Sequence, residues 1–243
     1  ASRGLGDVYK RQELERINQE LDRFAYIASH DLKSPLRGIE QLTHWLSEDL
    51  ADNTNENVQK YLGLIQNRIQ RMVLLLDGLL TFSRIGRVDI EMVDTDCRQL
   101  VEDMFALVAP PQGFELVIEG NFPRFKTVKT LLELVVRNLI SNAIKHHDRG
   151  GGVLKVQCET KGHYYWFSVI DDGPGISAQF HHKVFEMFQT LRPRDEVEGS
   201  GLGLSLVKKT VESLGGEILL ESAGRGCCFR FSWPMHIVNK EAV

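Results

Sequence analysis

The sequence predicts a helical hairpin that pairs with a second copy into a dimeric four-helix bundle, followed by a two-layer α+β domain with a mixed sheet. Up to about Gly86, two apolar stripes at helical spacing flank a short polar turn. After Gly86, helical stretches alternate with short β-rich ones, and the strands come in adjacent pairs. We expect the hairpin at 11–86 and the α+β domain at 87–243, with 1–10 as a tag or the remnant of a preceding domain.

Composition is that of an ordinary globular protein of one large or two modest domains, with 243 residues, 42% hydrophobic and 26% charged. No apolar run reaches the roughly 20 residues of a membrane-spanning helix. A net charge of −4 argues against a broad nucleic-acid-binding surface. The four cysteines lack zinc-ligand spacing, so we expect them to be reduced and buried. The expected location of this fragment is the cytoplasm, although its parent protein could be tethered to a membrane.

The hairpin is predicted from two helical patterns, at about 11–50 and from about residue 58 onwards, around a polar turn at 52–55. The second helix carries a regular seam with steps of four and three: Val58, Leu62, Ile65, Ile69, Met72, Leu76 and Leu79. A hairpin alone buries too little apolar surface, so we expect two copies to pair as a homodimer. The alternative is a hairpin that packs only on the next domain of its own chain.

The first helix carries His30 beside Asp31 on its polar side, about 150° away from the apolar stripe. Pro35 cannot donate a hydrogen bond to the carbonyl of Asp31, so it loosens the helix one turn later. The pattern indicates an imidazole that a ligand can reach. Taken alone, it also fits a solvated helix face.

The second domain is predicted element by element from periodicity and turn residues. Helices are expected at 96–108, 128–147, 177–185 and 203–214, and strands at 114–119, 153–159, 164–170, 217–221 and 228–233. Because paired strands lie between helices, a mixed or antiparallel sheet covered by helices on one side is favoured over a doubly wound parallel one.

A polar helix face is the first of three clusters that could carry chemistry. Asn138, Asn142 and Lys145 stand at i, i+4 and i+7. A carboxamide oxygen suits Mg²⁺ that already bridges phosphates, and a nearby lysine can balance phosphate charge. The alternative is an ordinary solvated face.

The second cluster follows a predicted strand and runs from Asp171 to Ile176. Two glycines, Gly173 and Gly175, flank a proline, so the backbone turns sharply and a planar ligand can approach. A carboxylate at the strand end can accept a hydrogen bond from an adenine amino group. A tight turn or a calcium loop is the alternative, but the alternating acids of a calcium loop are missing.

The third cluster, Gly199 to Leu204, leads into a helix. It matches neither a dinucleotide-binding glycine motif nor a P-loop. Glycines before a helix still expose amide donors at its positive end, which suits phosphates. The polar segment 187–198, with Phe185 and Phe188 at its root, is typical of a mobile flap over a nucleotide.

Together these motifs resemble, from about Leu14 to Pro234, the kinase core of a sensor histidine kinase from a two-component system. In the family's order they are an H box (Phe24 and 29–36), an N box (138–145), a G1 box (171–176) with its phenylalanine pair, and a G2 box (199–204). The resemblance implies a dimerisation and phosphotransfer hairpin followed by an ATP-binding domain of the Bergerat type.

The resemblance also implies roles for individual residues. His30 corresponds to the phosphoacceptor and Asp31 to its adjacent acid, Asn142 to the Mg²⁺ ligand and Asp171 to the adenine-binding acid. The remaining residues expected at the ATP site are Asn138, Lys145, His146, Gly173, Gly175, Ile176, Phe188, Gly199, Ser200, Gly201, Leu202, Gly203 and Leu204. Ser34 stands where threonine or asparagine commonly assists dephosphorylation of the response regulator.

Several residues depart from the family pattern. His146 and His147 follow the N-box lysine where tyrosine and then serine or threonine are common. Asp172 replaces a frequent asparagine, and Cys227 and Cys228 stand where small hydroxyl residues are usual.

The implied activity is an ATP-dependent protein-histidine kinase that phosphorylates His30 and passes the phosphoryl group to an aspartate of a response regulator. An upstream sensor domain is expected to control it. One alternative is an ATP-hydrolysing protein of the same nucleotide fold. However, relatives of that kind use a glutamate one turn before the Mg²⁺-binding asparagine, and here that position is Asn138. A catalytically degenerate dimeric scaffold is the second alternative.

Overall fold

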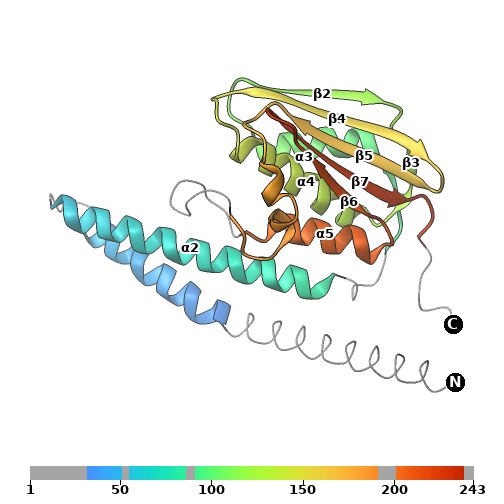
Figure 1. The fold of residues 1–243 in the computed structure, drawn as a ribbon. Coiled ribbons are helices and arrows are strands. Elements are labelled where there is room, and N and C mark those ends of the chain that lie inside the picture. Colours follow the sequence, from blue (N-terminus) through green and yellow to red (C-terminus); the bar gives the residue numbers. More distant parts are fainter. Residues whose placement is uncertain (1–31, 51–54, 86–90, 191–200, 238–243) are drawn as a thin grey trace, which may run out of the picture. The chain divides into compact units, whose positions relative to one another are not determined.

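The chain divides into two compact units, Ala1–Arg84 and Ile85–Val243. The structure, a computed structural model, describes residues 32–50, 55–85, 91–190 and 201–237 (Figure 1). His30, Asp31, most of the predicted turn at 52–55, Gly199 and Ser200 lie outside these ranges. Each unit is therefore described by itself.

The first unit is an antiparallel helical hairpin. Its first helix spans residues 32–49 in the described part, and its second is α2 (Glu56–Arg84). Polar contacts join the helices along their length: Gln66 donates to the hydroxyl of Ser47 over 2.8 Å, and an ion pair joins Lys33 to Asp77. Since positions near the end of one helix meet positions near the start of the other, the helices run in opposite directions. The predicted hairpin is confirmed.

In the middle of the predicted seam, covered and exposed positions alternate, and Val58, Leu76 and Leu79 towards its ends are half-buried. Leu62 and Ile69 on α2 are 8% and 2% exposed, whereas Ile65 and Met72 between them are 44% and 41% exposed. The first helix behaves in the same way, with Thr43 buried and large apolar side chains exposed beside it: Leu32, Ile39, Leu42, Trp45 and Leu46. A two-helix hairpin covers one side of each helix and leaves the rest of a wide apolar stripe in contact with water.

The second unit is built on a five-stranded sheet in the order β2-β4-β5-β7-β6. The strands are β2 (Phe114–Gly120), β4 (Gly152–Lys161), β5 (Tyr164–Asp171), β6 (Ile218–Glu221) and β7 (Cys227–Pro234). The β2–β4 pair is parallel and the other pairs are antiparallel. The sheet is therefore mixed, as predicted.

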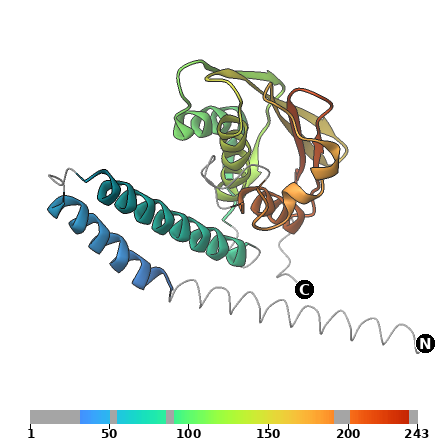
Figure 2. The same ribbon diagram turned by 60° about the vertical axis from the view of Figure 1, so that its left-hand side comes forward.

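Three helices cover one face of this sheet (Figure 2). They are α3 (Cys97–Val108), α4 (Lys129–Lys145) and α5 (Gly203–Ser213). Phe167 of β5 and Phe231 of β7 stack beneath them with ring centroids 5.2 Å apart. Val135, Val136 and Leu139 line the buried face of α4. This one-sided layering follows from strands with alternating burial, such as β4, beneath helices with one apolar stripe.

The cysteines belong to this core. All four are free, and Cys97, Cys158 and Cys227 are buried. Burial raises the pKa of the Cys97 and Cys158 thiols to about 12. They are uncharged at neutral pH and act as small apolar side chains.

A two-stranded antiparallel sheet, which the sequence did not predict, adjoins the core. It pairs β1 (Val93–Asp96) with β3 (Arg124–Thr127). Thr127 is fully buried and accepts a hydrogen bond from the indole N–H of Trp233 over 2.7 Å. Each strand has four residues, too few to show a period in the sequence.

One predicted helix is wrong. Residues 177–185 form two short 3-10 turns, η1 (Ala178–Phe180) and η2 (Lys183–Phe185), instead of a continuous helix. Ser177 makes no side-chain capping bond, and the segment is rich in residues of modest helix propensity. Phe185 of this segment packs against the core, and Val184 is buried.

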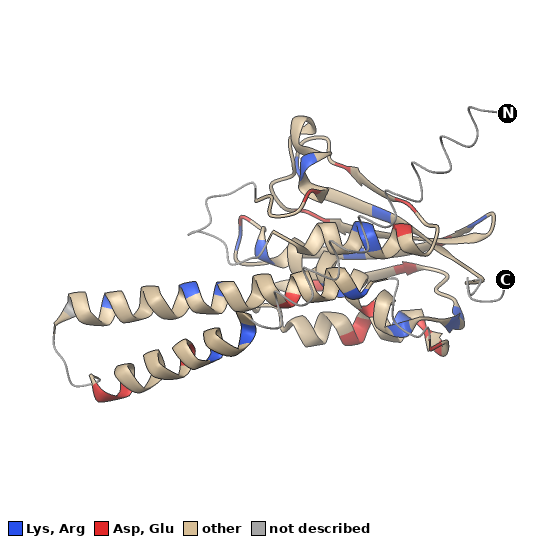
Figure 3. Ribbon diagram, turned by 90° about the horizontal axis from the view of Figure 1, so that it is seen from below, with Lys and Arg blue, Asp and Glu red and all other residues tan. Residues whose placement is uncertain are grey.

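Charged residues of both signs are interspersed over the described elements (Figure 3). None of the described helices is long and apolar enough to cross a membrane.

Candidate functional site

A cavity of about 340 Å³ lies between the C-terminal part of α4, the end of β5, the start of β7 and the N-terminus of α5. It brings together residues from all three predicted clusters, although the clusters are far apart in sequence. The predicted residues that line it are Asn142, His146, Asp171, Gly175, Ile176, Gly201, Gly203 and Leu204.

Helix α4 contributes the first polar group. Its apolar face is buried in the core, and Asn142, at the side of that face, lines the cavity. Asn138, one turn earlier, is not among the lining residues. Its amide donates to the carbonyl of Leu134 over 2.7 Å, and its Oδ1 lies 3.0 Å from the position a Cβ on Gly203 would take. Asn138 thus fixes the distance between α4 and α5. Lys145 is exposed and does not line the cavity.

Asp171 ends strand β5 and faces the cavity. Its Oδ1 accepts the backbone N–H of Gly173 over 2.9 Å, which fixes the orientation of the carboxylate. Burial raises the pKa of the Asp171 carboxyl above its ordinary value, against the opposing effect of hydrogen bonds from the N–H groups of Gly173 and Cys227. The result is a partly desolvated acceptor at the end of a rigid strand.

The G1 loop, residues 171–176, follows β5 and lies directly against the turn between β6 and β7. Gly175 has a φ of +80°, and a Cβ there would lie 2.0 Å from the carbonyl oxygen of Gly224. The N–H of Ile176 donates to the hydroxyl of Ser222 over 2.9 Å. Gly175 is therefore required both for its backbone conformation and for this close approach.

The N-terminus of α5 forms another edge of the cavity. Gly201 has a φ of +69°, and its carbonyl accepts the N–H of Phe188 over 2.9 Å. Gly203 begins the helix, so the unpaired N–H groups of its first turn lie beside the cavity. Gly173, Phe188 and Leu202 do not line the cavity, and Leu202 is fully buried.

Sequence reasoning missed many of the residues that line the cavity, and most of these are apolar. Its lining also includes Ala143, Pro174, Ser177, Phe180, Val184, Gln189, Thr190, Cys227 and Phe229. The register of β7 against β5 places Cys227 opposite Asp171, so a correct strand pairing would have brought Cys227 to the site. The polar groups thus surround an apolar slot, which suits a flat ligand with polar edges.

Fold and cavity define the class of protein: a helical hairpin joined to an α+β domain with a glycine-rich cavity that can hold a nucleotide. Residues 20–87 match the family described as "His Kinase A (phospho-acceptor) domain", and residues 127–237 match "Histidine kinase-, DNA gyrase B-, and HSP90-like ATPase". This chain belongs to the sensor histidine kinase family. Its second unit is an ATP-binding domain of that family.

The chain is similar, over most of its length, to parts of longer proteins. The chain is 39% identical over 226 residues to cyanobacterial phytochrome B of a Nostoc species, and the match covers 90% of this chain and 30% of that protein. It is 32% identical to the phytochrome-like protein Cph1 of a Synechocystis species, with 92% of this chain and 30% of that protein covered. The chain thus spans less than a third of these relatives.

Solved structures share the fold. Full-length ShkA in complex with AMPPNP matches with a TM-score of 0.70 at 22% identity, over 89% of this chain and 46% of that one. Histidine kinase ThkA in complex with the response regulator protein TrrA matches with a TM-score of 0.62 at 21% identity, over 95% of this chain and 67% of that one.

Proposed function

We propose that this chain is an ATP-dependent protein-histidine kinase that phosphorylates His30 and then passes the phosphoryl group to an aspartate of a response regulator. The observation that carries the proposal is the cavity that gathers Asn142, Asp171 and Gly203, in a chain whose hairpin belongs to a phosphoacceptor family. The domain limits that go with it are 11–86 for dimerisation and phosphotransfer and 87–243 for ATP binding.

Adenine is proposed to enter the apolar slot between Ile176 and Phe229. Asp171 would accept a hydrogen bond from the exocyclic amino group, because its Oδ1 is already oriented by Gly173. The first-turn N–H groups of α5, which begins at Gly203, would receive the phosphates. Gly199 and Ser200, from the same predicted motif, are also proposed to contact the nucleotide.

Asn142 is the proposed Mg²⁺ ligand. Its carboxamide lines the cavity and offers one neutral oxygen, which fits an ion that takes its other ligands from phosphates and water. When bound, Mg²⁺ neutralises phosphate charge. Lys145 and His146 extend α4 towards the same region, and His146 is a lining residue; both are proposed to contact phosphate oxygens.

The transfer step is proposed to use the His30–Asp31 pair. A carboxylate that holds the Nδ1 proton leaves Nε2 as the nucleophile, which attacks the γ-phosphorus in line. The bond from phosphorus to the β,γ-bridging oxygen breaks, a nitrogen–phosphorus bond forms, and ADP leaves. Ser34, which is exposed and follows His30 by four positions, is the proposed residue for positioning the water that dephosphorylates the response regulator.

A homodimer and a response regulator are the proposed partners. The half-covered seam, with Ile65 and Met72 exposed, supports pairing of two hairpins because apolar stripes of this length are rarely left in water. The ThkA complex described above gives the kind of regulator partner. An upstream sensor domain is the proposed source of the signal.

Phosphorylation with labelled ATP and Mg²⁺, followed by phosphosite mapping under conditions that preserve phosphoramidates, tests the proposal. The wild type should carry an acid-labile, base-stable label on His30. His30→Gln should lose the label, whereas His163→Gln, at an exposed histidine in the second unit, should keep it. Label that persists on His30→Gln would reject the assignment. Rapid release of phosphate without phosphohistidine would favour the ATP-hydrolysing alternative.

A further inference from the structure

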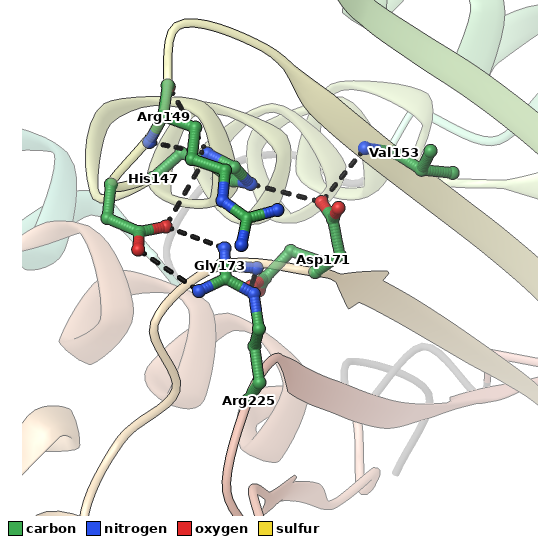
Figure 4. Close-up of polar contacts among 8 residues, drawn as sticks. His147, Arg149, Val153, Asp171, Gly173 and Arg225 are labelled. Atoms are coloured by element: carbon green, nitrogen blue, oxygen red, sulfur yellow. Dashed lines mark hydrogen bonds and ion pairs between the residues drawn. The ribbon is translucent and has the colours of Figure 1, made fainter.

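The histidine that follows the N box, His147, connects the end of α4 to the loop that presents Asp171 (Figure 4). Its Nε2 lies 3.0 Å from Oδ1 of Asp172, the neighbour of the proposed adenine-binding acid. The same Oδ1 accepts the backbone N–H of Val153 over 2.9 Å. Asp172 therefore joins three segments: the loop after α4, the start of β4 and the end of β5.

The proton on Nε2 of His147 follows from its partner, because the ionised carboxylate of Asp172 can only accept a hydrogen bond. Nε2–H is therefore the donor to Asp172. Nδ1 lies 3.1 Å from the backbone nitrogen of Arg149 and 3.3 Å from its carbonyl oxygen. Because the acceptor is a carboxylate, this bond is stronger than one between two neutral groups.

Tight packing fixes the ring of His147. Its side chain is 1% exposed and meets Phe114 edge to face, with ring centroids 5.3 Å apart. A Cβ on Gly152 would lie 2.4 Å from Nε2 and 2.6 Å from Oδ1 of Asp172. Gly152 thus leaves the space in which the histidine and the acid meet, and the ring has one position available.

The turn between β6 and β7 makes a second set of contacts, both with the segment after α4 and with the loop after β5. Asp148, next to His147, receives two hydrogen bonds from the guanidinium of Arg225, at 2.9 and 3.1 Å. Beside Arg225, the N–H of Gly226 donates to the carbonyl of Gly173 over 2.8 Å. The loop is therefore held between the α4 end and the β6–β7 turn, and its shape is set by groups outside the cavity.

We propose that His147 is a positioning residue for adenine recognition: through Asp172 it holds the turn at 171–173 in the one conformation that aims Asp171 into the cavity. This inference rests on the proposed function, in which Asp171 contacts the base. His147 does not line the cavity, so its effect on the nucleotide is indirect.

The electrostatics agree with a charged Asp172 carboxylate as the hydrogen-bond acceptor for His147. Against the opposing effect of its desolvation, hydrogen bonds from the N–H of Val153 and from His147 lower the pKa of Asp172 below its usual range. Asp171, by contrast, has a raised pKa. The two adjacent acids thus differ in role: Asp172 is held by the protein and Asp171 is left to the ligand.

The test is the preference of the whole chain for ATP over inosine triphosphate, measured by calorimetry with each nucleotide. Inosine carries a carbonyl in place of the exocyclic amino group and a proton on N1, so the ratio of affinities reports on recognition of the base edge that Asp171 is proposed to contact. In His147→Phe, which keeps a ring and removes both hydrogen bonds, we expect the ratio to fall by roughly tenfold. His147→Gln, whose amide can still donate to Asp172, should recover most of it.

Two controls separate this effect from loss of folding. His163→Phe, at an exposed site on the β4–β5 turn, should leave the ratio unchanged. Asp172→Asn keeps an oxygen acceptor for both donors, so it should change the affinity ratio only slightly. Asp172→Ala should lower the ratio as much as His147→Phe does, without a change in the core. Asp172→Ala decides the question if His147→Phe does not fold.

The outcomes are distinct. A folded His147→Phe or Asp172→Ala variant with the wild-type ratio overturns the inference and leaves the proposed function intact. A wild-type chain without preference for ATP overturns the adenine role of Asp171, and the inference with it. A general loss of nucleotide affinity with an unchanged ratio marks His147 as merely structural and also overturns the inference.

Discussion

Gly175 approaches the carbonyl oxygen of Gly224 so closely that a Cβ on Gly175 would lie 2.0 Å from it. Two loops that flank the cavity meet here backbone to backbone. Gly175 also has a φ of +80°, a backbone conformation that residues other than glycine rarely adopt. The contact sets the width of the cavity next to Ile176.

Gly175→Ala is therefore expected to lower the free energy of unfolding by about 2 to 4 kcal/mol, as the sum of left-handed strain and overpacking. Urea denaturation of the whole chain measures it. The matched control is Gly215→Ala, since Gly215 has a φ of +81° but nothing within 4 Å of a Cβ. That variant should lose only about 1 kcal/mol, the strain alone. Equal losses at both sites would contradict the close approach.

Asp171→Asn is expected to affect the stability of the fold and the affinity for ATP in different ways. Burial raises the pKa of Asp171 in the folded state, so the stability that this group contributes is greatest when it is protonated, below its ordinary pKa of about 3.9. That contribution is lost as pH rises through the raised folded-state value, and the buried carboxylate opposes folding at neutral pH. Asn avoids this penalty and keeps an acceptor for Gly173.

We therefore expect Asp171→Asn to be at least as stable as the wild type at pH 7, with the difference vanishing near pH 3, while ATP affinity falls by about tenfold or more. Chemical denaturation at the two pH values and calorimetry with ATP measure the two effects. An unstable variant at pH 7 would show that the carboxylate supports the fold and would contradict the prediction.

The bond from Trp233 to Thr127 anchors the small β1–β3 sheet to the core. Thr127→Val leaves the buried indole N–H without its partner and should lower the free energy of unfolding by about 1 to 3 kcal/mol. Thr160→Val, at an exposed threonine on β4, is the control and should change it by less than about 0.5 kcal/mol. A double-mutant cycle with Trp233→Phe should give a coupling energy of about 1 kcal/mol. Additive effects would mean that the bond contributes nothing.

The exposed half of the hairpin seam should be the dimer interface. Replacing Ile65 and Met72 with lysine places two charges in that stripe and should weaken association by at least about 100-fold, with the chain eluting as a monomer. Multi-angle light scattering over a concentration series measures this. ATP affinity should not change, because these residues belong to the other unit.

Leu107→Lys is the control for surface charge. Leu107 is 62% exposed on α3, outside the hairpin, so this variant should assemble as the wild type does. If the double lysine variant also assembles normally, the exposed seam is not the interface and the dimer proposal fails in this form.

Periodicity predicted the elements whose burial repeats along the chain. In β4, Leu154, Val156 and Cys158 are buried at every second position, and α4 buries Leu132, Val135, Val136 and Leu139. Both patterns are local, so they could be read without knowledge of neighbouring strands. The order of the sheet is not local, yet adjacent strand pairs were enough to predict that it is mixed.

Several polar residues that line the cavity were among those expected from the sequence, whereas most of its apolar lining was not. Asp171 and Asn142 stand out in the sequence by residue type, whereas Phe180 and Phe229 are indistinguishable from core residues until the strands are paired. Asn138 was expected near the phosphates, but its amide is used by the Leu134 carbonyl. The bracing by His147 could not be predicted either, because its partners come from three distant segments.

The two short turns η1 and η2 form the least constrained side of the cavity. Each spans three residues and is closed by few main-chain bonds, whereas the opposite wall is the end of β5, paired on both sides by β4 and β7. In amide hydrogen exchange, the protons of residues 178–185 should be replaced by deuterium far sooner than those of β5. A ligand larger than the cavity is therefore expected to displace this segment before it displaces the end of β5, where Asp171 lies.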